Sequence, residues 1–364
     1  MIRRVLMTAD AVSGVWTYSL ELARALAEHG VSVLLAVMGP APSPDKLRAA
    51  AAITNLQVEH RPFALEWMEH PWADVRLAGD WLLNLEARWQ PHLCHLNGFA
   101  HAGCDFSVPR IVVAHSCISS RHDAVHRGPL PGKWATYQRK TIAGLASADA
   151  VVAPTRWMLK ELERHYGRQV RGEVIAAARS PTGFQSARKE PIVFSAGRVW
   201  DEAKNLLVLD RAAEQVSWPV MIAGATDFSQ TAMGTFNHTG LLGELDPQGV
   251  SAWMARAAIY ASPAKYDPFG LSVLEAALSG CALVLGDIPS LREAWADAAL
   301  FVDPNSPAQW ASALDGLIAE PSLRRDLARR ATERSTGFSP RAQAAAYLTI
   351  YRSLTERSAH ARAS

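Results

Sequence analysis

Two successive series of alternating strand-like and helix-like segments constrain the fold of this chain more than any other feature of its 364 residues. The first series opens with an apolar segment at 3–9, an amphipathic helical segment at 15–30 and a second apolar segment at 31–39. This order is typical of the βαβ unit of a parallel sheet. A second series opens at 191–198 and continues through 281–287. The sequence therefore predicts two open, Rossmann-like α/β sheets that face each other across a cleft, the default ligand site.

The chain is also too long for one ordinary hydrophobic core, which favours two domains. We expect a first domain at 1–172 and a second domain at 191–340. The intervening residues 173–190 lose the apolar periodicity and gain Ser, Pro, Gly and charge, and we interpret them as a linker. A last helix is expected over 341–364, because the Ser-Pro pair before it suits a helix start.

The composition is that of a globular protein in water, with 49% apolar and 20% charged residues. A net charge of +2 is too small to indicate a nucleic-acid partner. The four cysteines form no C-x-x-C pair, so we expect a reducing, cytoplasmic setting rather than a disulfide scaffold. No signal peptide and no apolar run of about 20 residues is recognisable, which leaves at most a peripheral contact at the inner membrane face.

The segment GRVWDEAKN at 197–205 places two cations in a loop directly after a strand-like segment. Arg198 can clamp a diphosphate with two parallel hydrogen bonds, and Lys204 can add a point charge. Such a pair would also stabilise a departing phosphate as its negative charge develops. The alternative is a solvated loop with ordinary surface charges, and the segment alone leaves both readings open.

The segment DPFGLSVLEAALSG at 267–280 combines two carboxylates with a helix start. Gly270 lets the backbone turn closely, and the free N–H groups of a helix that begins near Leu271 form an anion site. Asp267 could accept hydrogen bonds from sugar hydroxyls, and Glu275 from ribose hydroxyls. In the alternative interpretation, Asp267 only starts a turn and Glu275 is paired with an arginine.

Two positions in the first half are weaker candidates. The first loop has the single glycine Gly14 rather than G-x-G-x-x-G, so the dinucleotide fingerprint is missing. Gly14 either brings backbone N–H groups to a phosphate or forms a tight strand–helix turn. His115 ends the strand-like segment 110–116 at the edge where ligands bind, and a lone histidine there is either structural or functional.

Two other motifs are assigned no chemistry. The segment HLCHLNGFAHAGC at 92–104 contains several histidines and cysteines, but strand alternation separates neighbouring side chains and no standard zinc spacing is present. We therefore predict no metal site. Ser290 and Glu293 have the spacing of a capping box, which predicts that Ser290 caps a helix.

Taken together, GRVWDEAKN at 197–205 and YDPFGLSVLEAALSGCALVLGDIPSLRE at 266–293 resemble glycosyltransferase family 4, also called glycosyl transferases group 1. The resemblance covers most of the chain and is strongest from Phe194 to Pro304. It implies the GT-B fold, in which two Rossmann-like domains face each other and the last helix returns to the first domain. It also implies a metal-independent, retaining enzyme without a cofactor.

The resemblance implies roles for single residues. Arg198 and Lys204 match the pair that grips the donor diphosphate, and Asp267 matches an acid at the sugar hydroxyls, where the family more often has Glu. Glu275 matches the acid that binds the donor ribose. His115 matches a histidine near the hydroxymethyl group of the donor sugar. The positions that match substrate-binding main chain are Gly14, Gly243, Gly270, Leu271 and Ser272.

One segment departs from the family pattern. Many members carry Asn-Gly, often as I-P-N-G, near the start of the second domain. This chain reads VIAAARSPTGF at 174–184, with Ala in those places. The difference would alter a hinge or a cleft contact and leaves the donor motif intact.

We therefore expect a hexosyltransferase that moves a sugar from a UDP-, GDP- or ADP-sugar to an unidentified sugar, lipid or small-molecule acceptor, in cell-surface or secondary glycan or glycolipid synthesis. The donor is expected on the second domain and the acceptor on the first. The main alternative is a catalytically weak sugar-nucleotide-binding or scaffold protein of the same fold. A dehydrogenase, which the missing fingerprint disfavours, and a GT-B epimerase or phosphorylase are further alternatives.

A basic segment in the first half bears on the acceptor. It would contact an anionic acceptor or a membrane surface, or it is a solvated helix face. Its members are Arg121, His122, His126, Arg127, Lys133, Arg139 and Lys140.

Overall fold

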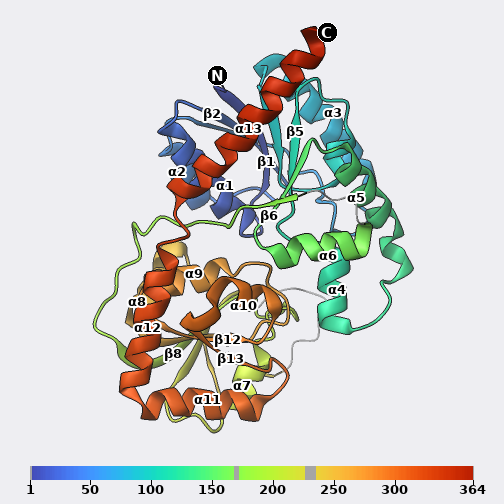
Figure 1. Cartoon of the computed structure of the whole chain (residues 1–364). Helices are drawn as coiled ribbons and strands as arrows, with labels where there is room; N and C mark the ends of the chain where they lie inside the picture. Colours follow the sequence, from blue (N-terminus) through green and yellow to red (C-terminus); the bar gives the residue numbers. More distant parts are fainter. Residues whose placement is uncertain (1, 168–171, 226–234, 364) are drawn as a thin grey trace. The chain divides into compact units, whose positions relative to one another are not determined.

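The computed structural model describes residues 2–167, 172–225 and 235–363, and its elements form two compact units (Figure 1). Unit 1 comprises Met1–His122, Gly128–Ala178 and Pro340–Ser364. Unit 2 comprises Asp123–Arg127 and Arg179–Ser339.

Unit 1 is built on a seven-stranded parallel sheet in the order β3-β2-β1-β4-β5-β6-β7. Parallel sheets bury both faces, which explains why β1 and β2 read as continuous apolar runs. The strands are β1 Arg4–Asp10, β2 Ser32–Met38, β3 Leu56–His60, β4 Leu93–Leu96, β5 Arg110–Val113, β6 Ala150–Ala153 and β7 Gly172–Val174. The helices are α1 Val15–Ala27, α2 Pro44–Ala51, α3 Trp72–Trp89, η1 Ala100–Gly103, η2 Gly132–Trp134, α5 Ala135–Ser147, α6 Arg156–Tyr166 and α13 Pro340–Ala363. Helix α4, Ile118–His126, contributes its last residues to unit 2.

Unit 2 is built on a six-stranded parallel sheet in the order β10-β9-β8-β11-β12-β13. Its strands are β8 Glu190–Ala196, β9 Val220–Ala223, β10 Gly240–Leu241, β11 Ala257–Ser262, β12 Ala282–Gly286 and β13 Ala299–Val302. Its helices are α7 Leu207–Ala213, α8 Pro247–Arg256, α9 Leu271–Leu278, α10 Pro289–Trp295, η3 Ala296–Ala298, α11 Pro307–Ala319 and α12 Pro321–Ser335. The two predicted parallel α/β sheets are therefore confirmed.

The strand order reverses at one place in each sheet. In unit 1 this switch point lies between β1 and β4, and in unit 2 it lies between β8 and β11. Ligands of open α/β sheets bind in the crevice at the carboxyl ends of the two strands that meet at such a point. The topology therefore indicates one candidate ligand site in each unit.

The last helix, α13, lies beside α1 in unit 1 (Figure 1). The Tyr18 hydroxyl group on α1 donates a hydrogen bond of 2.6 Å to the Tyr347 hydroxyl group on α13. Nδ1 of His95, on β4, lies 2.6 Å from the Tyr351 hydroxyl group. Since all four side chains are buried, this polar cluster ties the two ends of the chain to the core of unit 1.

Some boundaries differ from those expected. Strand β7 occupies Gly172–Val174 and pairs with β6, so regular structure continues into the segment interpreted as a linker. The capping-box prediction was wrong, because Pro289 occupies the first turn of α10 and Ile288 is its N-cap residue. The Ser290 hydroxyl group instead donates a 2.6 Å hydrogen bond to the carbonyl oxygen of Asp267.

Candidate active site

The switch point of unit 2 gathers most of the predicted site residues. Arg198 and Lys204 lie in the loop after β8, and Asp267 lies in the loop after β11. These two strands are neighbours, so their loops emerge at the same edge of the sheet. Residues separated by more than 60 positions in the sequence are thereby brought into hydrogen-bonding contact.

Lys204 and Asp267 form a direct ion pair. Nζ of Lys204 lies 2.8 Å from Oδ2 of Asp267, and the two side chains are 25% and 11% exposed. Oδ1 of the same carboxylate accepts hydrogen bonds from the backbone N–H groups of Phe269 and Gly270, at 3.2 and 2.7 Å. Asp267 therefore starts the turn, as the alternative interpretation held, and also presents Lys204 at the switch point.

Gly270 ends this turn in a conformation that favours glycine. Its φ is +85°, and an added Cβ would lie 3.0 Å from side-chain atoms of Leu291 and Val273. Helix α9 begins at Leu271, directly after this left-handed residue. The first N–H groups of a helix have no partner within it, so Leu271 and Ser272 present backbone donors where the turn ends.

Arg198 is held by its own loop. Its guanidinium donates a 2.6 Å hydrogen bond to Oδ2 of the buried Asp201, and it lies over the Trp200 ring at 5.3 Å. Oδ1 of Asp201 accepts from the Ala203 N–H group at 3.0 Å, which fixes the carboxylate. Nε of Arg198 is buried and has no hydrogen-bond partner within the described residues. A buried cationic donor without an acceptor is costly, and it is satisfied when an anion binds beside it.

Glu275, on α9, is paired with Arg179. Nε of Arg179 lies 2.8 Å from Oε1 of Glu275, and the two side chains are 20% and 18% exposed. The guanidinium also lies over the Phe184 ring at 5.0 Å. Arg179 belongs to the segment 174–184 that departs from the family pattern. Sequence reasoning anticipated an arginine partner for Glu275 without identifying which arginine it is.

Gly243 follows β10 in unit 2. Its φ is +69°, no atom lies within 4 Å of an added Cβ, and its carbonyl oxygen accepts a 2.8 Å hydrogen bond from the Gly224 N–H group. The main chain at Gly243 is therefore tied to the sheet and open on its Cα side.

The two remaining candidates, Gly14 and His115, lie in unit 1. Gly14 is the N-cap residue of α1 with φ −63°, a conformation that other residues also adopt. Nε2 of His115 lies 2.8 Å from Oδ1 of Asn97, and its ring meets the Tyr18 ring edge-on at 4.5 Å. Burial lowers the pKa of His115 to about 4, so its imidazole is neutral at pH 7.

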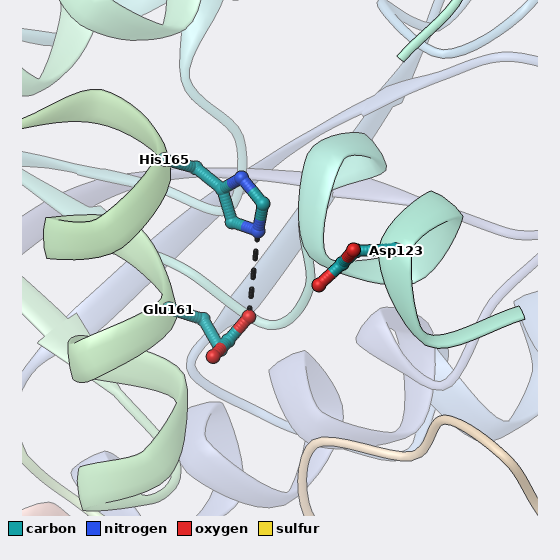
Figure 2. Close-up of side chains that lie close together, drawn as sticks. All are labelled: Asp123, Glu161 and His165. Carbon is teal, nitrogen blue, oxygen red and sulfur yellow. Dashed lines mark ion pairs between the residues drawn. The ribbon is translucent and has the colours of Figure 1, made fainter. Parts of the chain in front are cut away.

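The histidine-rich segment 92–104 has structural partners. His95 contacts Tyr351, as described above, and Nε2 of His101 lies 3.1 Å from the carbonyl oxygen of Val75. The four cysteines are free thiols. On α6, Nε2 of His165 faces Oε2 of Glu161 at 3.4 Å (Figure 2). Figure 2 also labels Asp123, which belongs to the other unit, and no metal site is assigned to these residues.

Among the described residues, no helix is both long and apolar enough to cross a lipid bilayer.

Both halves of the chain match known glycosyltransferase families. Residues 12–177 match the family described as Glycosyltransferase Family 4, and residues 179–334 match Glycosyl transferases group 1. A D-inositol 3-phosphate glycosyltransferase from Nocardia farcinica is 27% identical over 91% of this chain and 82% of its own length.

Solved structures show the same fold. Sucrose-phosphate synthase from Thermosynechococcus elongatus superimposes with a TM-score of 0.82 at 18% identity, covering 98% of this chain and all of the other. HepE from Anabaena, solved in complex with UDP and glucose, gives a TM-score of 0.76 at 15% identity over 97% of this chain and all of the other.

Two adjoining family matches account for most of the sequence, and the two parallel sheets have the GT-B fold. The chain belongs to glycosyltransferase family 4, with a group 1 domain in its second half, and is a glycosyltransferase that uses nucleotide-sugar donors.

Proposed function

We propose that this protein transfers a hexose from a UDP-, GDP- or ADP-sugar to a hydroxyl group of an acceptor, with retention of the anomeric configuration. The observation that carries the proposal is the switch point of unit 2. There Lys204 is held by Asp267, and Arg198 keeps a buried, unpartnered Nε. This cationic edge, next to the start of α9, has the charge and the donors that a diphosphate requires.

Each predicted residue takes one part in the reaction. Arg198, Lys204 and the first N–H groups of α9, at Leu271 and Ser272, bind the diphosphate and stabilise it as it departs. Asp267 accepts from hydroxyl groups of the transferred sugar once Lys204 turns toward phosphate. Glu275, oriented by Arg179, accepts from the ribose hydroxyls.

The other candidate residues bind and orient the donor. The main chain at Gly243 binds the nucleobase, and the Gly270 turn brings backbone toward the phosphates. Gly14 contributes backbone near the phosphates, and the neutral His115 hydrogen-bonds the hydroxymethyl group of the donor sugar.

The transfer requires no reactant other than the donor and the acceptor. The acceptor oxygen bonds to C1 of the sugar while the bond from C1 to the diphosphate oxygen breaks. The electron pair leaves with the diphosphate, and the acceptor proton passes to a phosphate oxygen on the same face of the sugar. The positive side chains and helix N–H groups stabilise the charge that develops on the leaving group.

The named relatives indicate which donors to test first. HepE was solved with UDP and glucose, and the Nocardia relative is named for D-inositol 3-phosphate. These names support a hexose donor with a nucleoside diphosphate. They do not select the acceptor of this chain.

The test is product analysis with UDP-, GDP- and ADP-hexoses and a panel of hydroxylated acceptors. NMR coupling constants at the new anomeric centre distinguish retention from inversion. We expect one nucleotide to be preferred and the anomeric configuration to be retained. An inverted product would contradict the mechanism.

A second candidate function is sugar-nucleotide binding without efficient transfer. It is favoured by one observation: both acids of the motif are already engaged, Asp267 by Lys204 and Glu275 by Arg179. Tight nucleotide binding without turnover of any donor, across the same panel, would support this function over transfer.

A further inference from the structure

The switch point of unit 1 holds a cavity of about 60 Å³. It lies where β1 and β4 end, and it is bordered by residues 64–67, by Met38 and by His101. A buried water needs roughly 10–15 Å³ of such space, so the cavity has room for roughly four waters or the hydroxylated edge of a ring. The established donor chemistry assigns no role to it.

Two carboxylates line this cavity, and each is held by uncharged donors. Oδ1 of Asp10 accepts from the backbone N–H groups of Val12 and Ser13, at 2.9 and 2.7 Å. Oε2 of Glu66 accepts from the Ala100 N–H group at 2.7 Å. Neither carboxylate has an ion-pair partner in the part of the chain that the structure describes. Asp10 therefore faces the cavity without a counter-charge, while burial raises the pKa of Glu66 and favours its neutral form.

The other lining residues add no positive charge. His101 lines the cavity, and burial lowers its pKa to about 4, so it is neutral at pH 7. Lys46 donates to the carbonyl oxygen of Ala11, beside Asp10, and is not a lining residue. The described lining is therefore negative overall, which opposes the entry of an anion.

The cavity also presents a flat aromatic surface. Trp67 lines it and is 39% exposed, although tryptophan is among the more buried residue types. Sugar and cyclitol rings place their C–H faces on such surfaces, while their hydroxyl groups donate to carboxylate or amide oxygens. Asn97 adds an amide, and its Nδ2 is oriented by the carbonyl oxygen of Thr8 at 2.7 Å.

We propose that this cavity binds the hydroxylated ring of the acceptor, and that this ring is a sugar or cyclitol that carries no phosphate. Hydroxyl or amino groups of the ring donate to Asp10 and Glu66, and its C–H face lies on Trp67. Phosphorylated rings are disfavoured because the Asp10 carboxylate faces them without a counter-charge. The inference rests on the proposed transferase function and names the acceptor class for it. It opposes the anionic acceptor that the basic segment at 121–140 had left open.

The test compares ligand pairs that differ in one phosphate, using the full chain with saturating nucleoside diphosphate. The pairs are myo-inositol and myo-inositol 3-phosphate, D-glucosamine and D-glucosamine 6-phosphate, and D-glucose and D-glucose 6-phosphate. Calorimetry measures each Kd. We expect the unphosphorylated member of at least one pair to bind tenfold more tightly or better. Equal or tighter binding of the phosphorylated member throughout, or binding of no member, overturns the proposal.

Two variants localise the effect. Trp67→Ala should raise the Kd of the preferred ring at least tenfold. Glu66→Gln should reduce the ratio of the Kd of the phosphorylated ligand to that of the unphosphorylated ligand at least threefold. Leu77→Ala is the matched control, since Leu77 is an exposed apolar residue of unit 1 outside the cavity. Circular dichroism checks that every variant is folded. Unchanged affinity in Trp67→Ala, with the fold intact, would also overturn the proposal.

Failure of this inference is distinguishable from failure of the proposed function. A thermal-shift titration with UDP, GDP and ADP reports on unit 2 through ligand-linked stabilisation. If none of these nucleotides binds, the proposed function fails. If a nucleotide binds and its sugar is transferred to a phosphorylated acceptor in preference, only the acceptor inference fails.

Discussion

The two switch points of this protein use acidic residues in opposite ways. In unit 2, Asp267 is paired with Lys204 and Glu275 with Arg179, so carboxylates hold cations in place. In unit 1, Asp10 is held by backbone N–H groups and a serine hydroxyl group, and Glu66 by backbone N–H groups alone. The same topology thus produces one edge where a carboxylate holds a lysine and one edge where carboxylates are held by N–H and hydroxyl groups without a cation.

The difference has a simple energetic basis. When an anion takes the place of Asp267 beside Lys204, the cation keeps a counter-charge, and the carboxylate keeps its hydrogen bonds from the Phe269 and Gly270 N–H groups. A carboxylate held by N–H groups has no cation beside it, so an incoming anion finds no positive charge with which to form an ion pair. We therefore propose that the donor diphosphate binds mainly to unit 2 and that a neutral acceptor ring binds to unit 1.

The largest effect is expected from Lys204→Ala. It removes the cation that we propose binds the diphosphate, and it leaves the Asp267 side chain, which is 11% exposed, without its partner. We expect kcat/KM for the donor to fall at least 100-fold, which corresponds to about 3 kcal/mol. Steady-state kinetics on the preferred donor measure it.

The control for this variant is Arg256→Ala. Arg256 forms an exposed ion pair with Glu190 in the same unit. Exposed pairs contribute little, so its kcat/KM should change less than twofold. If kcat/KM for the donor fell less than threefold in Lys204→Ala, the proposal that the unit 2 switch point binds the diphosphate would be contradicted.

Acid should destabilise unit 1 before unit 2. Burial lowers the pKa of His95 to about 3, and those of His101 and His115 to about 4, and all three lie in unit 1. The unfolded chain takes up these protons from about pH 6.5, so the stability is full above that pH and falls as the pH drops toward 4. Each histidine contributes a slope of up to about 1.4 kcal/mol per pH unit. Glu66 offsets part of the loss, because burial raises its pKa.

Hydrogen exchange between pH 7 and pH 5 measures this difference unit by unit. Protection of the unit 1 strands should decline more steeply than that of the unit 2 strands. His95→Gln should remove about one proton from the slope of unit 1. Equal slopes in the two units would contradict the account.

A smaller effect is expected from Arg179→Ala. Without the guanidinium, the Glu275 carboxylate loses the partner that orients it for the proposed contact with the ribose. We expect the Kd of the nucleoside diphosphate to rise about tenfold, or about 1.4 kcal/mol. Arg179→Lys keeps the charge and loses the fixed geometry, so an intermediate Kd is expected. Calorimetry measures both, and tighter binding in Arg179→Ala would mean that Arg179 competes with the ribose.

The smallest effect is expected from Ser290→Ala. It leaves the carbonyl oxygen of Asp267 without the hydroxyl donor and should lower the free energy of unfolding by about 1 kcal/mol. Ser217→Ala removes an exposed hydrogen bond to Asp315 and should cost less than about 0.5 kcal/mol. Chemical denaturation measures both, and equal losses would remove Ser290 from the support of the turn.

Features that depend on residues close together in the sequence, such as turns and helix starts, were predictable from local sequence patterns. The turn at Asp267 and the helix start after Gly270 follow from a carboxylate and a glycine three residues apart, and the structure has both. The strand-helix alternation likewise predicted both sheets. The short segment 44–60, which forms α2 and β3, carries too few apolar repeats to stand out.

Contacts between distant residues were not predictable from one sequence. Arg179 meets Glu275 across 96 positions, and no local pattern marks that pairing. For Ser290, the local pattern gave a wrong prediction. Its spacing to Glu293 fits a capping box, but its hydroxyl group donates a hydrogen bond to the carbonyl oxygen of Asp267, 23 positions away. The carboxylates of the unit 1 cavity, Asp10 and Glu66, were overlooked because only the sheet topology brings them together.

The most direct test of the central claim is a crystal structure of the full chain with UDP, GDP or ADP. The account predicts the diphosphate between Arg198, Lys204 and the start of α9, with the ribose hydroxyls at Glu275. A nucleotide bound against Asp10 and Glu66 in unit 1, or none bound at the switch point of unit 2 at saturating concentration, would contradict it.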